Sequence, residues 1–422
     1  MRKRKNGTVL GAVIVVLLTA AVVTGGVLVW RAAGAKTAVP EMQPTVQEPV
    51  AEQPLQPSVQ EQEPARKVEV QVERALGPVP EQPPVQQQTQ TLTLMALGDN
   101  LIHNCVYWSA ELPEGGYDFS PFYREIEKTV QSYDLACINQ ETIYVKDAWN
   151  VSNYPDFGSP TQVGDALVQA GFDVVSCATN HCFDKGMTGL NDTLSFWKEN
   201  YPAITLLGIH DTQEDAQSVK VVEKNGIRLA MLNYTYGMNS GRPAEHWRVD
   251  EFSTYDRVRG DLQKAEAAAD LTVVFAHWGE EGQYQPNSYQ KTWAQFLADN
   301  GADVIIGAHP HVLQPLETVT AADGREVPVF YSLGNFLHHQ TDYRQMLGGM
   351  ASVTFTKDET GVRVSAYELK PTVNVIFRSG DWYDYCPMLL DDYTDEIAAQ
   401  HRFEECTVEE MKKLFLEITG KD

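Results

Sequence analysis

Several short apolar segments of the sequence are followed directly by polar side chains that can bind a cation or transfer a proton. In chain order these are Asp99, Glu141, Asn180, His181, His277, His309 and His311. Carboxylate, amide and imidazole groups together suit first-row divalent metals such as Mn, Fe or Zn, whereas a structural zinc site would favour cysteine. On an extended segment, the imidazoles of His309 and His311 would share one face. The set predicts a site for one or two divalent metal ions.

Each of these residues also has a structural explanation. A single buried histidine is more often hydrogen-bonded within a core than bound to a metal, and Asp99, after Gly98, would suit a turn or a helix cap. Asp184 and Glu280 are candidates to orient the imidazoles through hydrogen bonds, with exposed or turn positions as the alternative. Asn335 either reaches the site or belongs to a turn. The shared position after apolar segments favours a functional site.

The elements that must position these residues are strands alternating with helices. Apolar segments typical of strands cover 91–97, 134–138, 173–178, 271–276 and 303–306. Helical patterns cover 121–132, 162–170, 187–200, 254–269 and 288–300. This alternation predicts an α/β fold, in which ligands bind at the carboxyl ends of the strands.

A second pattern predicts antiparallel strands. The Asn225-Gly226 pair, flanked by apolar residues, is typical of a tight β-hairpin. Turn sequences at 322–324 and 358–361 suggest two more hairpins, and a final helix is expected over 407–418. The sheets are therefore expected to be mixed.

The amino-terminal segment has a different character. Residues 8–30 carry no charge and, at about 1.5 Å per residue, are long enough to cross a hydrocarbon core as a helix. Four of the first five residues are basic, which favours a cytoplasmic amino terminus and a single-pass signal-anchor in the cell membrane. A cleaved signal peptide is the alternative. Residues 37–90 are rich in Pro, Gln and Glu and read as a disordered linker.

Composition bounds the possible functions. The 422 residues include 33 basic and 57 acidic side chains, a formal charge of −24, which argues against a nucleic-acid partner. The chain is expected to comprise a basic stub with the membrane anchor (1–36), the linker (37–90), a folded extracytoplasmic domain (91–380) and an acidic extension packed on that domain (381–422). Six cysteines in an exported domain allow disulfides, and a pair between Cys386 and Cys406 is considered beside free thiols.

The polar blocks also resemble a known family. The order and content of six blocks, 98–99, 139–141, 178–186, 277–281, 307–314 and 331–336, are similar to the CapA family of poly-γ-glutamate capsule biosynthesis proteins. That family is a branch of the calcineurin-like metallophosphoesterase superfamily. The resemblance covers about residues 92–337, and the His-Trp-Gly and Ser-Leu-Gly-Asn-Phe blocks are its most distinctive parts.

The resemblance implies a four-layer αββα sandwich and a metal centre. By position, the implied metal ligands are Asp99, Glu141, Asn180, His277, His309 and His311. His181 matches the catalytic histidine that stabilises the transition state or protonates the leaving group. The superfamily has a histidine two residues after the first aspartate, where this chain has Leu101, and an aspartate where it has Glu141. His103 lies nearby, but its spacing differs from that pattern.

The implied function is a membrane-anchored, extracytoplasmic protein of poly-γ-glutamate capsule or exopolymer biosynthesis. Its activity would be metal-dependent hydrolysis of a phosphoester or a γ-glutamyl amide. The expected partners are the membrane, the anionic polymer and other capsule-synthesis membrane subunits. A non-catalytic polymer-handling or scaffold subunit is the main alternative, and a cell-surface nucleotidase or phosphodiesterase is a third.

Overall fold

The computed structural model describes residues 89–380 and 382–420. The expected membrane segment at 8–30 and nearly all of the expected linker lie outside these residues. Within the described ranges, no helix has both the length and the apolar character needed to cross a membrane.

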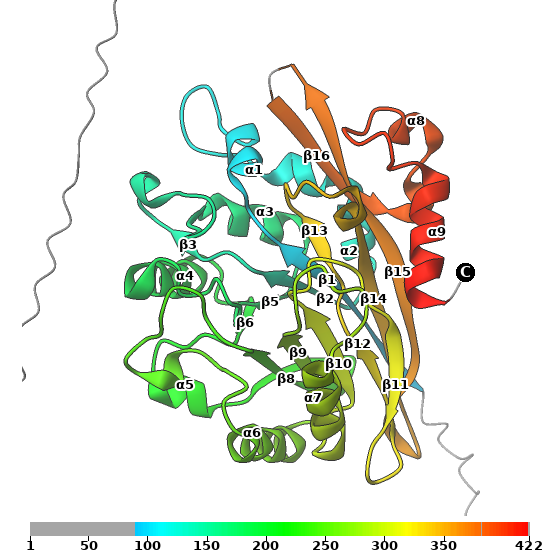
Figure 1. Cartoon of the computed structure of the whole chain (residues 1–422). Helices are drawn as coiled ribbons and strands as arrows, with labels where there is room; N and C mark the ends of the chain where they lie inside the picture. The colour runs from blue at the N-terminus through cyan, green and yellow to red at the C-terminus, as the bar shows by residue number, and fades with distance from the viewer. Residues whose placement is uncertain (1–88, 381, 421–422) are drawn as a thin grey trace, which may run out of the picture. The chain divides into compact units, whose positions relative to one another are not determined.

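Two mixed sheets form the framework of the folded unit (Figure 1). In the eight-stranded sheet, the order is β16-β15-β14-β1-β2-β5-β6, with β13 also beside β1. Strands β1, β2, β5 and β6 run parallel, and β14, β15 and β16 extend the sheet from β1 with each strand antiparallel to the one before it. The bounds are β1 Gln90–Asn100, β2 Leu135–Gln140, β5 Val174–Ser176, β6 Thr205–Leu207, β13 Asn335–Leu337, β14 Leu347–Asp358, β15 Gly361–Ser379 and β16 Trp382–Leu389.

The second sheet has six strands in the order β11-β12-β10-β9-β8-β7. Its parallel centre is β8, β9, β10 and β12, with β7 and β11 antiparallel at the two edges. The bounds are β7 Lys220–Lys224, β8 Ile227–Thr235, β9 Leu271–His277, β10 Val304–Ala308, β11 Leu316–Thr320 and β12 Glu326–Phe330. A separate short pair, β3 Tyr144–Val145 and β4 Ser159–Pro160, lies outside both sheets.

Side chains of the six-stranded sheet alternate between two cores, as the two-residue period of a strand requires. Along β9, Val273 and Phe275 belong to the large core shared with the eight-stranded sheet, whereas Val274 and Ala276 face helices α6 and α7. These two helices cover the outer face of this sheet (Figure 1). Because both faces of β9 are buried, its sequence is a nearly continuous apolar run.

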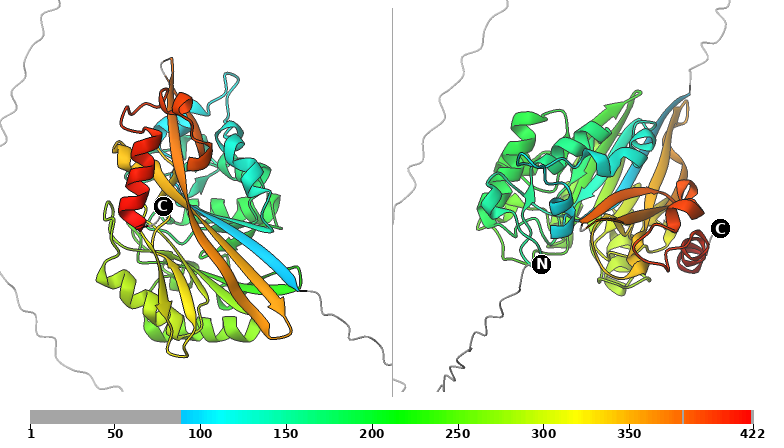
Figure 2. Two further views of the ribbon diagram at one scale, coloured as in Figure 1. Left: turned by 90° about the vertical axis from the view of Figure 1, so that its right-hand side faces the viewer. Right: turned by 90° about the horizontal axis from the view of Figure 1, so that it is seen from above.

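The remaining helices pack mainly against the eight-stranded sheet, and α9 lies along its carboxyl-terminal strands (Figure 2). The helices are α1 Asn104–Ser109, α2 Arg124–Val130, α3 Gln162–Ala170, α4 Gly186–Asn200, α5 Gln213–Gln217, α6 Tyr255–Ala268, α7 Ser288–Asp299, α8 Asp395–Ala398 and α9 Val408–Thr419. The fold is therefore α/β with mixed sheets, and the described unit is layered helix, sheet, sheet, helix.

Most element predictions hold, with informative differences at their ends. The expected helix over 121–132 begins as a 3₁₀ turn at Ser120–Tyr123, because Pro121 lies in its first turn, and continues as α2. Asn225 and Gly226 both have positive φ, 53° and 71°, as a tight hairpin of this type requires.

The expected acidic extension packed on the domain, 381–422, includes a strand of the eight-stranded sheet. Strand β16 pairs with β15 along its whole length, so the expected boundary after residue 380 lies at the turn of a hairpin. Residues 382–389 are thus part of the eight-stranded sheet. All six cysteines are free thiols in the structure, so the considered Cys386–Cys406 disulfide is not formed.

Candidate metal centre

The carboxyl ends of strands from both sheets meet at one place, and the candidate residues lie there. Asp99 and Glu141 lie at the ends of β1 and β2, and Asn180 and His181 lie in the loop after β5. His277 ends β9, and His309 and His311 follow β10. The side chains of the two sheets touch, since His277 Nε2 lies 2.7 Å from Asn180 Oδ1. The strand-end pattern therefore brings together residues up to 212 positions apart.

His311 lies between two buried carboxyl groups. Its Nδ1 is 3.0 Å from Asp99 Oδ2, and its Nε2 is 3.5 Å from Glu141 Oε1. Asn335 Oδ1 lies 3.1 Å from the same Nδ1, and the Asn335 side-chain amide donates to the His311 carbonyl. Four residues expected at the site thus contact one another in one cluster: Asp99, Glu141, His311 and Asn335.

His309 and His311 do not lie on an extended segment, so the condition under which their imidazoles would share one face is not met. Their φ angles are 97° and 56°, in the left-handed region that side chains with a Cβ adopt at a cost of about 1–2 kcal/mol. The chain turns sharply here after β10. The turn still places both imidazoles at the centre, and the ring of His309 lies 5.0 Å from that of His277 and 4.6 Å from that of Tyr236.

His181 is oriented by Asp184. His181 Nδ1 lies 2.6 Å from Asp184 Oδ2, which also accepts a hydrogen bond from the Phe157 backbone. The Phe157 ring meets the His181 ring edge-on at 4.8 Å. Asp184 therefore occupies the orienting position expected for it.

Glu280 makes no such contact with an imidazole within the described ranges. Its side chain is exposed, and its carbonyl accepts a hydrogen bond from Gln283. The neighbouring Glu281 is exposed as well, and burial followed by the charge of Glu281 raises the pKa of Tyr236 to about 12. Neither acid has a hydrogen bond to an imidazole among the described residues, so the orienting role of Glu280 stays a prediction.

The electrostatics of the centre follow from burial and from the carboxylates. Burial raises the pKa of Glu141 well above its usual value. Burial opposes charge on His311, but the carboxylates of Glu141 and Asp99 outweigh it and raise the pKa of His311 to about 10. Burial and the neighbouring imidazoles hold the pKa of His277 and His309 well below its usual value. The site therefore favours a positive charge held between its carboxylates.

Several buried polar atoms at the centre have no hydrogen-bond partner among the described residues. They are Glu141 Oε1 and Oε2, Asn180 Nδ2 and His309 Nδ1. Burying a polar group without a partner costs about 1–3 kcal/mol. Ligand atoms of Glu141, His309 and His311 lie within 4.8 Å of one another. Convergent carboxylate and imidazole groups that lack partners fit a bound divalent cation.

Four residues at the centre were not among the predicted site residues. Asn139 donates to Asp99 Oδ1 at 2.8 Å, Tyr236 follows β8, and His338 follows β13 with a buried Nε2 that lacks a partner among the described residues. His103 is the fourth, and its pKa is lowered to about 3 by burial and by nearby imidazoles, including those of His311 and His181. Strand-end position was the signal that could have found Asn139 and Tyr236.

The position where the superfamily pattern has a histidine holds an apolar side chain. Leu101 is buried, with 2% of its surface exposed. His103 Nδ1 accepts a hydrogen bond from the backbone of His339 at 3.2 Å. His103, two residues further along the chain, thus contacts the segment after β13, and the imidazole that contacts Asp99 is that of His311.

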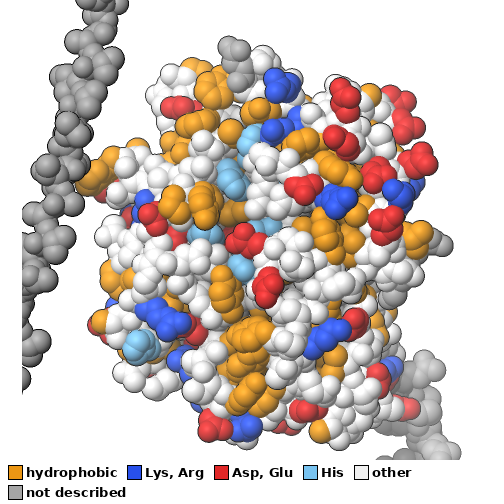
Figure 3. Space-filling view, viewed as in Figure 1, with side chains coloured by type: hydrophobic (Ala, Val, Ile, Leu, Met, Phe, Trp, Pro, Cys, Tyr) orange, Lys and Arg blue, Asp and Glu red, His pale blue; other side chains and the backbone are white. Residues whose placement is uncertain are grey.

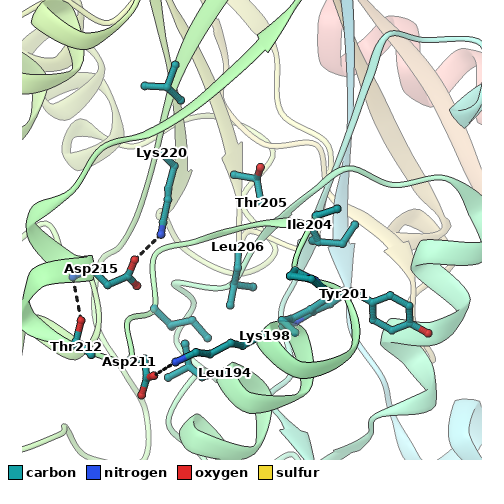
Figure 4. Close-up of a pocket in the computed structure, with 15 residues that line it drawn as sticks. Leu194, Lys198, Tyr201, Ile204, Thr205, Leu206, Asp211, Thr212, Asp215 and Lys220 are labelled. Carbon is teal, nitrogen blue, oxygen red and sulfur yellow. Dashed lines mark hydrogen bonds and ion pairs between the residues drawn. The ribbon is translucent and has the colours of Figure 1, made fainter.

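Histidine side chains gather on one face of the molecule (Figure 3). Figure 3 shows histidine side chains following one another along a hollow of this face, with acidic side chains beside the lower ones and basic side chains beside the uppermost. A separate cavity of about 470 Å³ lies elsewhere, between α4, β6, α5 and β7 (Figure 4). Its walls include the ion pairs Lys198–Asp211 and Lys220–Asp215 and none of the residues of the centre.

Two curated relatives match part of the chain. The capsule biosynthesis protein CapA of Bacillus anthracis is 34% identical over 180 residues, which are 42% of each chain. The PGA biosynthesis protein CapA of Bacillus subtilis (strain 168) is 32% identical over 198 residues, 46% of this chain and 50% of the relative. The chain thus matches half or less of the length of these relatives.

Solved structures with a similar arrangement are distant. A putative 5'-nucleotidase from Staphylococcus aureus is 14% identical, with a TM-score of 0.41 over 66% of this chain and 54% of that one. The calcineurin-like phosphoesterase YfkN from Bacillus subtilis is 15% identical, with a TM-score of 0.40 over 79% of this chain and 100% of that one. The model of the family described as bacterial capsule synthesis protein PGA_cap matches residues 93–340, more than half of the 422 residues, and the chain therefore belongs to that family.

Proposed function

We propose that this protein acts in the synthesis, export or attachment of a poly-γ-glutamate capsule or related exopolymer, as a metal-dependent hydrolase with a metallophosphoesterase-like four-layer fold. The bond cleaved is a phosphoester or a γ-glutamyl amide. Membership of the PGA_cap family and the capsule and PGA biosynthesis names of two relatives support the process. The buried cluster of carboxylates and imidazoles supports the chemistry.

The residues that would hold the metal are Glu141, His309 and His311, with Asp99, Asn180 and His277 beside them. A bound divalent cation supplies a Lewis acid that polarises a phosphoryl or carbonyl oxygen. The single observation that carries the proposal is Glu141, whose two buried oxygens lack hydrogen-bond partners in the described part of the chain. The nearest imidazole nitrogens, at 3.5 and 3.8 Å, do not satisfy them.

His181 would handle the proton of the leaving group. The Asp184 carboxylate can only accept, so His181 Nδ1 carries a proton and Nε2 is the atom that exchanges one. The contact with Phe157 and the hydrogen bond to Asp184 fix the ring, and fixed orientation is what general acid catalysis needs. Burial of this ring keeps bulk water from competing for the proton.

Metal content of the purified full-length chain tests this proposal. We expect about one or two Mn, Fe or Zn ions per chain, strongly reduced in His309→Ala and unchanged in His246→Ala, which removes an exposed histidine far from the cluster in sequence. We also expect hydrolysis of a model phosphoester or a γ-glutamyl peptide that depends on the metal. A His309→Ala protein with the metal content of the unmodified chain would contradict the proposed centre.

A second candidate function is a non-catalytic polymer-handling or scaffold subunit. The observation that favours it is the buried, apolar Leu101, at the place where the superfamily pattern has a histidine. This candidate predicts a bound metal without turnover of either substrate class. The same two measurements therefore separate the two functions.

The anchoring of the protein is also proposed. We place the amino terminus in the cytoplasm, residues 8–30 in the cell membrane and the folded unit outside, where the polymer and other capsule-synthesis membrane subunits are the partners. The uncharged run and the basic residues before it support this arrangement. Fractionation of cells that express the full chain, and the chain without residues 8–30, tests it, since only the full chain should be recovered with the membrane.

A further inference from the structure

Two arginines near the carboxyl terminus have no acidic partner within the described ranges. Most arginines of this acidic chain form ion pairs, for example Arg257 with Asp250 and Arg325 with Asp303. Arg402 and Arg378 form none in the described part of the molecule, although acidic residues outnumber basic ones 57 to 33. An unpaired guanidinium in an acidic protein is free to bind an external anion.

Arg402 is held in one orientation. Its Nη1 donates to His339 Nε2 at 2.7 Å, and its guanidinium carbon lies 4.9 Å from the centre of the Tyr383 ring and 4.6 Å from that of Phe403. Since arginine has donors only, His339 Nε2 must accept, and its ring proton is on Nδ1, facing the Tyr385 hydroxyl. Stacking and one hydrogen bond fix the guanidinium plane, while its other N–H groups keep their hydrogen-bonding capacity.

Arg378 extends this positive region. Its side chain is exposed, and its guanidinium carbon lies 5.9 Å from the same Tyr383 ring. The burial of His339 and the charge of Arg402 lower the pKa of His339 to about 4, so this histidine is neutral and adds no positive charge of its own. The positive charge here comes from the two arginines.

This region is connected to the metal centre by direct contacts. The His339 backbone donates to His103 Nδ1, the His103 ring lies 5.5 Å from that of Phe157, and the Phe157 ring lies 4.8 Å from that of His181. Asn335, which contacts His311, is four residues before His339, so the two lie at most about 14 Å apart along the chain. Figure 3 shows basic side chains beside the uppermost histidine of the hollow.

We propose that Arg402, assisted by Arg378, is a subsite that binds a carboxylate of an acidic polymer whose bond to be cleaved lies at the metal centre; this rests on the proposed function. A guanidinium matches a carboxylate with two parallel hydrogen bonds. A γ-linked glutamyl unit adds two carbon–carbon bonds to the ordinary peptide repeat and is about 6 Å long. The span of at most about 14 Å between Asn335 and His339 therefore corresponds to about two such units or fewer.

The subsite also explains how an acidic protein holds a polyanion. Two polyanions repel, so contact requires local positive charge. The cation at the metal centre and the two arginines would provide it at two separate points. A ligand with carboxylates at regular spacing can use both, whereas a single small anion can use one.

Calorimetric binding of γ-linked pentaglutamate to the full-length protein, in excess chelator so that no metal contributes, tests the subsite. Arg402→Gln should weaken binding about 10- to 100-fold, as expected for a charge-assisted hydrogen-bond pair. Arg402→Lys should weaken it less, and Arg378→Gln less again. Arg363→Gln, which removes an arginine paired with Asp358 at a distant hairpin, should leave the affinity unchanged. The same peptide with its α-carboxyls amidated should not bind.

Equal affinity of Arg402→Gln and the unmodified chain would overturn the subsite, as would equal binding of the amidated peptide or stronger Arg402-dependent binding of inorganic phosphate. Thermal unfolding of each variant shows whether it is folded. If Arg402→Gln does not fold, the affinities of Arg402→Lys and Arg378→Gln test the subsite in its place. Arg402-dependent binding without any hydrolysis would contradict the proposed hydrolase alone. Hydrolysis of the polymer with binding independent of Arg402 would contradict the subsite alone.

Discussion

Two buried histidine clusters lie at the carboxyl ends of strands, and they differ in whether their polar atoms have partners. His210 follows β6, and both ring nitrogens meet carboxylates, with Nε2 2.7 Å from Asp250 and Nδ1 3.3 Å from Asp215. Those acids are themselves paired with Arg257 and Lys220. At the metal centre, by contrast, Glu141 and His309 retain polar atoms without partners among the described residues.

This difference separates a structural cluster from a candidate binding site. A strand-end position is shared by both and does not distinguish them. A fully hydrogen-bonded network stabilises the fold and needs no ligand. A buried group that lacks a partner costs stability, and a ligand that supplies the partner offsets that cost.

We call the metal centre, with its unpartnered polar atoms, the incomplete cluster, and the His210–Asp215–Asp250 group the complete cluster. The largest expected effect is loss of metal from the incomplete cluster. Glu141→Gln keeps the size of the side chain and removes its charge, and we expect metal affinity to fall by at least about 100-fold, since even residues that only orient ligands contribute about 10- to 100-fold. Metal titration with competing chelators measures this. His210→Gln, the matched change in the complete cluster, should bind metal like the unmodified chain. Equal metal loss in both variants would remove the distinction between the clusters.

The next effect concerns stability and pH. Burial disfavours a charge on His210, but hydrogen bonds and charge from Asp215 and Asp250 raise its pKa to about 9. Because the folded value is above the unfolded value of 6.5, the stabilisation is complete below pH 6.5 and is lost as the pH rises to about 9. The shift corresponds to about 3 kcal/mol at most.

Denaturant unfolding of the metal-free protein from pH 6 to pH 10 measures this dependence. We expect the unmodified chain to lose stability through that window and His210→Gln to start lower and change less. A His246→Gln variant, which alters an exposed histidine, should follow the unmodified chain. If His210→Gln shows the full pH dependence, the complete cluster is not the source of it.

The strand-end residues could be predicted from sequence because their signal is local. Asp99, Glu141, Asn180 and His277 each follow an apolar run, and an α/β fold places such ends on one edge. The Asn225-Gly226 hairpin has the same local character. Type and order of these elements were therefore predictable, while helix starts such as that of α2 depended on a single proline.

Other features depend on contacts that no local pattern reports. The place of Arg402 depends on its backbone hydrogen bond to Ile376 and on the Tyr383 ring of β16, a strand that was expected to be outside the domain. The left-handed turn at His309 and His311 likewise follows from packing after β10, not from their spacing.

A smaller effect should come from the group that orients His181. Asp184→Asn keeps the size of the side chain but removes the carboxylate that holds the Nδ1 proton. We expect turnover to fall about 10- to 100-fold, with little change in metal content, because Asp184 acts through His181. Steady-state kinetics at several pH values should show an altered pH profile as well as a lower kcat. Loss of metal in proportion to activity would place Asp184 among the residues that hold the cation instead.

The smallest expected effect is on the free energy of unfolding, and it concerns the complete cluster around His210. Thr212 accepts a hydrogen bond from the Asp215 backbone and caps α5, the short helix that presents Asp215 to His210. Thr212→Ala should lower the free energy of unfolding by about 1 kcal/mol, the usual contribution of such a cap. Thr212→Ser, which keeps the hydroxyl, should restore most of it. Because the cap serves only the complete cluster, metal affinity should not change. A Thr212→Ala chain with weakened metal binding would show that the two clusters are coupled through the fold, and that their difference in hydrogen bonding is not sufficient to separate their roles.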